Sequence, residues 1–192
     1  MTTTDTPAID LAREVLLQVL RERSPSWEQG SDVGHIVREI GTSMGLDPVT
    51  VRHMFSAAEL HGIGKVAIPD EILNKPSALD NAEWHIMQGH VDAAVRILSI
   101  VDEFVPVANI IRQVFERYDG TGYPQSLAGT SIDLPARIVH VGVAFHAMTV
   151  ARPYREALQV DEALAQLEQG KGTQFDPIAV DALVSLVRSL SV

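Results

Sequence analysis

Apolar residues recur at helical spacing along most of the chain. In residues 7–23 they are Leu11, Val15, Leu16, Val19 and Leu20, and in residues 31–44 they are Val33, Ile36, Val37, Ile40 and Met44. Because residues three and four apart share one face of an α-helix, this spacing predicts amphipathic helices that each bury one side. No segment alternates apolar and polar residues between turn signals, so the pattern predicts an all-α fold, a bundle of many helices.

Capping signals and apolar stripes together place the remaining helices. They are expected at residues 48–60, 81–97, 107–118, from 135, from about 161 and from 177. The clearest start signal is Asp80 with Glu83, whose spacing is that of a capping box. Asp47 and Asp176 each precede a proline, a combination typical of a first helical turn. The polar stretch at residues 24–30 is the best internal boundary, so we expect an N-terminal helix and linker at 1–29 and a domain at 30–192.

Composition narrows the classes of partner. The 192 residues include 25 acidic and 15 basic side chains, which gives a formal net charge of −10, and no cysteine. A negative surface repels nucleic acid and anionic membranes, so we expect neither as a partner. The missing cysteines exclude disulfides and thiolate sites, and there is no apolar run long enough for a membrane span or signal peptide. These features favour a cytoplasmic protein.

Four segments, in this order, carry a resemblance to a known family. They are His61-Gly-Ile-Gly-Lys65 with Ile68–Pro76, then Glu116-Arg-Tyr-Asp-Gly-Thr-Gly-Tyr-Pro124, then Thr149 with Arg152-Pro-Tyr-Arg155, and finally Gly172–Pro177. Together they resemble the HD-GYP domains of the HD superfamily, from about residue 30 to the C-terminus. The resemblance implies a helical domain of bacterial cyclic di-GMP signalling. It also implies two or three metal ions, held by His and Asp residues, that activate water to hydrolyse cyclic di-GMP.

The sequence departs from this family pattern at most of the metal-ligand positions. His61 and His90 remain. The positions that have lost the expected ligand are Gln29, Gly62, Val114, Phe115, Val143 and His146. Two imidazoles cannot hold two divalent cations, which need bridging oxygens and further donors. We therefore expect a degenerate domain with no catalytic residue, no metal and no other cofactor, that is, a pseudoenzyme and not an enzyme.

Two other interpretations of the histidines are weighed against this one. His61 and His90 also suit hydrogen-bonded core histidines, which we favour over a single residual metal ion bound between them. Alternatively, Glu116, His140 and His146 could join them in a rebuilt phosphohydrolase centre. His140 and His146, however, lie about 240° apart around an ideal helix. This angle argues against a shared site.

Binding functions remain open. Lys65 and Arg152 match positions that would line the nucleotide pocket, so they could hold a phosphate of cyclic di-GMP or a related nucleotide without turnover. A lysine near a helix C-terminus and an arginine paired with carboxylates are the structural alternative. Either role is compatible with the sequence.

The loop formed by Asp119, Gly120, Thr121, Gly122, Tyr123 and Pro124 is intact. In the family this loop is implicated in docking to diguanylate cyclase domains, so the resemblance implies a surface for a protein partner. The alternative is a rigid loop that only covers the core. We expect a non-catalytic signalling module that acts by protein–protein interaction. The helix at 7–23 either caps the core or pairs with a second copy in a homodimer.

Overall fold

The computed structural model describes residues 8–23, 30–151 and 156–190, and in these ranges it contains helices and no strand. The all-α prediction is thus confirmed. The α-helices are α1 Ala8–Arg23, α2 Gly30–Ser43, α3 Pro48–Leu60, α4 Asp70–Leu73, α5 Asn81–Gln88, α6 His90–Leu98, α7 Val105–Gln113, α8 Leu134–Thr149, α9 Val160–Gln169 and α10 Pro177–Leu190. Short 3₁₀ turns, η2 Ile63–Ala67, η3 Asp102–Phe104 and η4 Gly129–Ser131, connect some of them.

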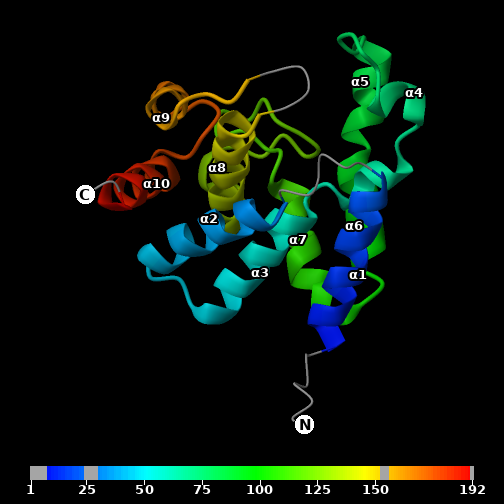
Figure 1. Cartoon of the computed structure of the whole chain (residues 1–192), viewed down its shortest axis with the longest axis horizontal. Helices are drawn as coiled ribbons and strands as arrows, with labels where there is room; N and C mark the ends of the chain where they lie inside the picture. The colour runs from blue at the N-terminus through cyan, green and yellow to red at the C-terminus, as the bar shows by residue number, and fades with distance from the viewer. Residues whose placement is uncertain (1–7, 24–29, 152–155, 191–192) are drawn as a thin grey trace.

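Helix α8 runs through the middle of the molecule, as Figure 1 shows, with α2 and α3 beneath it. Helices α6 and α7 lie on one side and α9 and α10 on the other, while α4 and α5 extend outward at the upper right. The core is formed where these helices meet, and Met54, Ala58, Ile111 and Ile138 have no exposed surface. This arrangement buries the apolar side that each stripe in the sequence predicts.

Local signals begin several helices where the sequence places them. The Asp47 side chain accepts hydrogen bonds from the amides of Val49 and Thr50, which caps α3. At α5, the Asp80 and Glu83 side chains form the complete capping box. Each capped amide is one of the donors that a helix start otherwise leaves without a partner.

Two helix ends differ from the predictions. The single helix expected at 81–97 is two helices, because α5 ends at Gln88 and α6 begins at His90. The helix expected to reach Tyr118 ends at Gln113, where the chain turns. Ile86 is accordingly 45% exposed although His90, four residues later, is buried. The two residues do not share one apolar stripe.

Helix α1 packs against the core through Leu17 and Leu20. On the same helix, the guanidinium Nε of Arg13 lies 3.4 Å from Glu59 Oε2, and Glu59 is only 4% exposed. The predicted boundary at residue 29 falls at 24–29, outside the described residues, and stays a prediction. Within the described ranges, no helix has both the length and the apolar character needed to cross a bilayer.

Candidate functional site

The two histidines that match the family pattern are held by the backbone in the same way. His61 follows the last residue of α3, and its Nδ1 donates to the Ala58 carbonyl at 2.7 Å. His90 is the first residue of α6, and its Nδ1 donates to the Met87 carbonyl at 2.8 Å. A carbonyl can only accept, so each ring presents the lone pair of its Nε2 atom. The Nε2 atom of His90 is buried and has no hydrogen-bond partner among the described residues.

Burial keeps both imidazoles neutral. It lowers the pKa of His61 to about 3, against a smaller opposing effect of the Ala58 hydrogen bond, and it lowers the pKa of His90 to about 4. The positive charge of Lys65 lowers both pKa values further. His146 on α8 also acts electrostatically on His61, so the fold brings a third imidazole toward this pair. Lys65 is thus the basic side chain whose charge acts on both rings.

Aromatic rings fill the space beside the histidines. The Phe115 ring lies 4.7 Å from the His90 ring and 6.3 Å from the His61 ring. The Tyr123 ring stacks on Phe115 at 5.5 Å with an interplanar angle of 15°. Because Phe115 and Tyr123 are only partly buried, this cluster reaches the surface. We call His61, His90, Phe115 and Tyr123 the histidine–aromatic site.

Trp84 on α5 extends the cluster outward. Its ring lies 6.1 Å from the Tyr123 ring, nearly perpendicular to it, and the residue is 47% exposed. Sequence reasoning missed this residue, because Trp84 and Tyr123 are far apart in the chain. The only signal in the sequence was a large aromatic residue in the helix expected at 81–97.

The loop at 119–124 is attached to the core by Glu116. The Glu116 carboxyl group, 1% exposed, accepts hydrogen bonds from the amides of Gln125 at 2.6 Å and Leu127 at 3.1 Å. A side chain at Gly122 would lie 2.3 Å from the Arg117 amide, so the loop passes directly over the backbone there. Asp119 accepts hydrogen bonds from the Thr121 amide and from Arg117. These contacts give the loop one shape.

The rebuilt centre considered from the sequence is not assembled. His140 Nδ1 donates to the Glu116 carbonyl at 2.8 Å, and its ring lines a small cavity with Gln174 and Asp176. Arg137 pairs with Asp176 in the same cluster. The Glu116 carboxyl group already accepts hydrogen bonds from backbone amides after the loop, and His140 lies in the separate cluster with Asp176. Neither residue therefore joins the histidines near Phe115. His146 is the one member of the suggested set that acts on His61.

The other predicted positions lie in or around this region. Val114 is buried, Gly62 is buried at the start of η2, and Val143 on α8 is partly buried. Lys65 lies in η2. Gln29 and Arg152 fall outside the described residues. Of the suggested phosphate-binding pair, the structure therefore describes Lys65 and not Arg152.

The donor set does not fit the pair of cations that the family pattern implies. In the part of the chain that the structure describes, no three His, Asp or Glu side chains converge as a metal site. Phe115 contributes a hydrocarbon ring where a ligand would be needed, and glycine at 62 has no donor. The Nε2 atoms of His61 and His90, each oriented by a carbonyl bond on the opposite ring nitrogen, are arranged as in metal-ligating imidazoles.

Comparisons with known proteins identify relatives of this chain. The profile of the HD domain family matches residues 13–178. The chain is 42% identical, over 79% of its length, to a cyclic di-GMP phosphodiesterase response regulator of Xanthomonas campestris. It is 40% identical over 66% of its length to a 3'3'-cGAMP-specific phosphodiesterase of Vibrio cholerae, and 35% identical over 83% to a cyclic di-GMP phosphodiesterase of Thermotoga maritima. It spans 41%, 28% and 44% of these proteins, less than half of each.

Solved structures agree on the fold. The crystal structure of a cyclic GMP-AMP-specific phosphodiesterase of Vibrio cholerae matches 84% of this chain and 44% of that chain, with a TM-score of 0.67 and 19% identity. An HDGYP protein from Bdellovibrio bacteriovorus matches 83% of this chain and 51% of that chain, with a TM-score of 0.66 and 21% identity. At such low sequence identity, the structural similarity shows a shared helical architecture alone.

One prediction from the sequence is wrong in the light of these relatives. We expected an inactive homologue and not an enzyme, because ligand positions are lost. Relatives that are 35–42% identical are named as cyclic di-GMP and 3'3'-cGAMP phosphodiesterases, which points to an enzyme. The loss of ligand positions from one family pattern does not by itself show that activity is lost, because another set of donors could support the same reaction.

Proposed function

Since this chain belongs to the HD domain family, we propose that it acts in cyclic di-GMP signalling on a cyclic dinucleotide, which it holds at the histidine–aromatic site. The observation that carries the proposal is the partly exposed stack of Phe115 and Tyr123 against the His90 ring, on which the charge of Lys65 acts. Aromatic faces stack on nucleobases, and an ammonium group attracts phosphate. The names of the relatives support the same class of substrate.

The neutral histidines suit an anionic ligand held by Lys65. A neutral imidazole does not repel the ammonium group of Lys65 as a protonated ring would, so Lys65 and the two rings can share one region. The residues of this chain would thus bind and orient the dinucleotide.

The experiment is calorimetric titration of the whole chain with cyclic di-GMP and with 3'3'-cGAMP. Chromatography of the same samples detects any linear product, with and without added Mn²⁺. Lys65→Met should weaken binding by about tenfold or more, because a charge-assisted contact to phosphate is lost. Arg96→Met, which removes an exposed charge on α6, is the matched control and should bind as the unchanged protein does. Failure of both cyclic dinucleotides to bind at high micromolar concentration would contradict the proposal.

A second candidate function is protein docking at the loop 119–124, for which a diguanylate cyclase domain is the partner that the family resemblance suggests. The exposed Trp84 ring against Tyr123 favours it, because tryptophan and tyrosine dominate the energies of protein interfaces. Trp84→Ala should then abolish capture of a purified diguanylate cyclase domain and leave cyclic dinucleotide binding within about twofold. Capture that survives this substitution would argue against the loop face as the docking surface.

A further inference from the structure

A second candidate binding site lies away from the histidine–aromatic site. A pocket of about 530 Å³ opens where α2, α8 and α10 meet the first turn of α9. Its lining residues are His35, Ile36, Glu39, Phe145, Val160, Asp161, Leu183, Leu186 and Val187, none of which belongs to the histidine–aromatic site. Pockets that hold small molecules have volumes of roughly 300–1,000 Å³, so this one has a suitable size.

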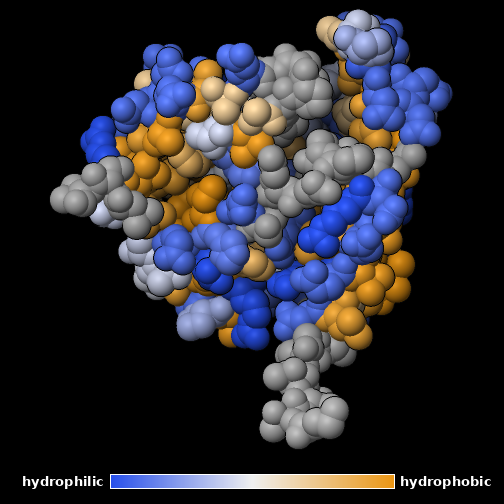
Figure 2. All heavy atoms as spheres, in the orientation of Figure 1, coloured by the Kyte–Doolittle hydropathy of each residue, from blue (hydrophilic) through white to orange (hydrophobic). Residues whose placement is uncertain are grey.

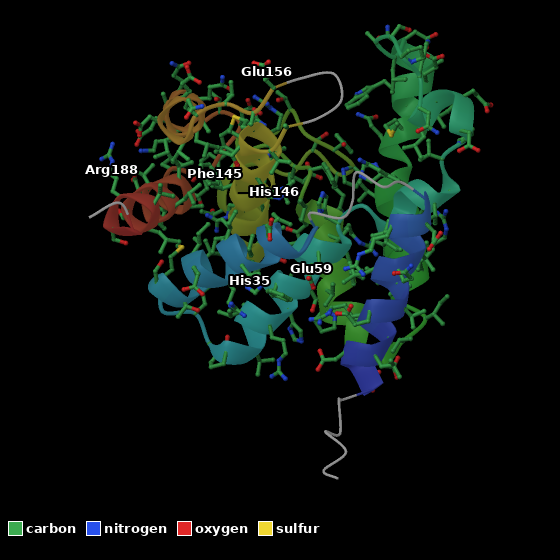
Figure 3. All side chains as sticks on the ribbon, viewed as in Figure 1. His35, Glu59, Phe145, His146, Glu156 and Arg188 are labelled. Carbon is green, nitrogen blue, oxygen red and sulfur yellow. The ribbon has the colours of Figure 1, made fainter. Side chains whose placement is uncertain are left out.

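The pocket has an apolar floor. Phe145 and Leu183 are 7% and 0% exposed, and Ile36, Leu186 and Val187 are partly buried around them. Figure 2 shows apolar surface in a hollow in the left part of the view, between the regions that Figure 1 labels α2, α9 and α10. Figure 3 labels two of the lining residues, His35 on α2 and Phe145 on α8. An apolar floor of this kind favours a ligand with a hydrocarbon or aromatic body.

The rim of the pocket is acidic. Glu39 on α2 and Asp161 in the first turn of α9 are both exposed. Arg38 offsets part of this charge through Nε, 3.5 Å from Glu39 Oε1, but both side chains are about half exposed, and ion pairs in that setting are weak. The chain as a whole carries a net charge of −10, which adds to the negative potential.

From this combination we propose that the pocket binds an amphipathic cation, with its apolar body on Phe145 and Leu183 and its positive group between Glu39 and Asp161. The charge at the rim selects against fatty acids and nucleotides, which are anions. The ligand class therefore differs from that of the histidine–aromatic site, and the inference does not depend on the proposed function. Because Phe145 and His146 are neighbours on α8, an occupied pocket would contact the helix that also carries the third imidazole.

Two ligands that share a decyl chain and carry head groups of opposite charge test the proposal. The intact chain is titrated with decyltrimethylammonium and with decyl sulfate, each below its micelle concentration, and binding is followed by calorimetry. We expect the cation to bind about tenfold or more tightly than the anion, because the two carboxylates at the rim attract a positive head group and repel a negative one. Equal affinities, or binding of neither probe, would overturn the proposal.

Substitutions locate the binding. Leu186→Trp places an indole ring in the pocket and should reduce the affinity for the cation by about tenfold. Ile178→Trp, at an exposed position of the same helix outside the pocket, should leave the affinity unchanged. Glu39→Lys with Asp161→Lys should reverse the preference toward decyl sulfate, whereas Glu71→Lys with Glu103→Lys, which makes the same change in net charge elsewhere, should not.

The two pairs of lysine substitutions show whether the ligand preference comes from charges at the pocket or from the net charge of the whole chain. If the Glu71 and Glu103 substitutions shift the preference as much as those of Glu39 and Asp161, the site assignment is wrong. Sedimentation of the unliganded chain tests whether a second copy of the chain occupies the pocket instead of a small molecule. A dimer that Leu186→Trp dissociates would make the pocket a contact between two copies, and the ligand proposal would fall.

Discussion

At the scale of single residues, the orientation of an imidazole decides what the ring can do. The Nδ1 atoms of His61 and His90 both donate to a carbonyl three residues earlier, so each neutral ring carries its proton on Nδ1. The sequence carries this information only in part. The sequence places a histidine three residues after Ala58 and another three residues after Met87. The direction of each ring also depends on whether a helix ends or begins at the histidine, and the sequence does not show this.

The buried histidines predict a loss of stability in acid. Burial lowers the pKa of His61 to about 3 and the pKa values of His90 and His140 to about 4, while the unfolded chain takes up these protons near pH 6.5. Their contribution is therefore complete above pH 6.5 and falls as the pH decreases toward 4, by on the order of 1 kcal/mol per histidine per pH unit. Urea denaturation at pH 7.5 and pH 5.5 measures the loss.

A pair of variants isolates this effect from other titrating groups. His140→Gln should lose less stability than the unchanged protein between the two pH values, because one of the three protons is no longer taken up. His85→Gln, at an exposed position on α5, should show the original loss. Indistinguishable losses in the unchanged protein and in His140→Gln would refute the explanation.

The sequence located the members of the site better than it explained them. His61, His90, Phe115 and the loop do form one region, as the family resemblance suggested. The role of Glu116 was not predictable, because its partners are backbone amides nine and eleven residues away. Side chains that bind backbone leave no pattern of their own, since any residue type can supply the amide.

At the scale of elements, periodicity found the helices and misplaced two of their ends. Residues 81–97 keep helical spacing across Gly89, so nothing in the pattern reveals that a new helix begins at His90. The chain leaves α7 after Gln113 because its next residues join the loop that Glu116 holds. Such ends are set by contacts with other segments, which a stripe of apolar residues does not encode.

The contact between η2 and α6 predicts a strict requirement at position 64. A side-chain carbon added to Gly64 would lie 1.8 Å from the His90 carbonyl oxygen and 2.5 Å from the Ala94 amide, and backbone atoms cannot move aside easily. Gly64→Ala should therefore destabilise the fold by about 3 kcal/mol or more. Thermal or urea denaturation checks the value.

A glycine in open space is the control for Gly64. Gly45 has a φ of +75° and no atom within 4 Å of an added side-chain carbon. Gly45→Asn should cost less than about 1 kcal/mol, because asparagine adopts this backbone conformation more readily than most residues. A similar cost for the two substitutions would mean that η2 does not approach α6 closely enough to exclude a side chain at position 64.

At the scale of the whole molecule, α1 joins the core. The sequence left open whether this helix caps the core or pairs with a second copy. Leu17 and Leu20 pack into the core, and Arg13 reaches the buried Glu59 on α3, so capping is one role of the helix. On the outer side, Leu11, Val15 and Val19 are 63%, 57% and 47% exposed, so pairing with a second copy stays a prediction.

The pair of Arg13 and Glu59 predicts a substitution whose cost depends on pH. Burial raises the pKa of Glu59 to about 7, and the charge of Arg13 opposes this rise. A raised carboxyl pKa means that the folded state keeps its proton longer than the unfolded state does, so stability is lost as the pH rises from about 4.5 through 7. Arg13→Met should destabilise the fold by about 2–4 kcal/mol at pH 8, where it leaves a buried charge, and by less than about 1 kcal/mol at pH 5.5.

Denaturation at the two pH values tests this prediction. Arg52→Met removes an exposed guanidinium from α3 and should have the same small effect at both. An Arg13→Met variant that is equally destabilised at pH 8 and pH 5.5 would show that packing of the side chain matters and its charge does not.

The interruption at Gly89 separates two parts of the molecule that the sequence presents as one. Because the His90 Nδ1 atom donates to the Met87 carbonyl, in the last turn of α5, a residue inserted between Met87 and His90 would change the direction of the His90 ring. A change of length before Asp80, where α5 begins, leaves this spacing intact. Homologues can thus differ in the outer part of the arm formed by α4 and α5 while His90 keeps its orientation, and exchange of that part between homologues would be the practical use of this independence.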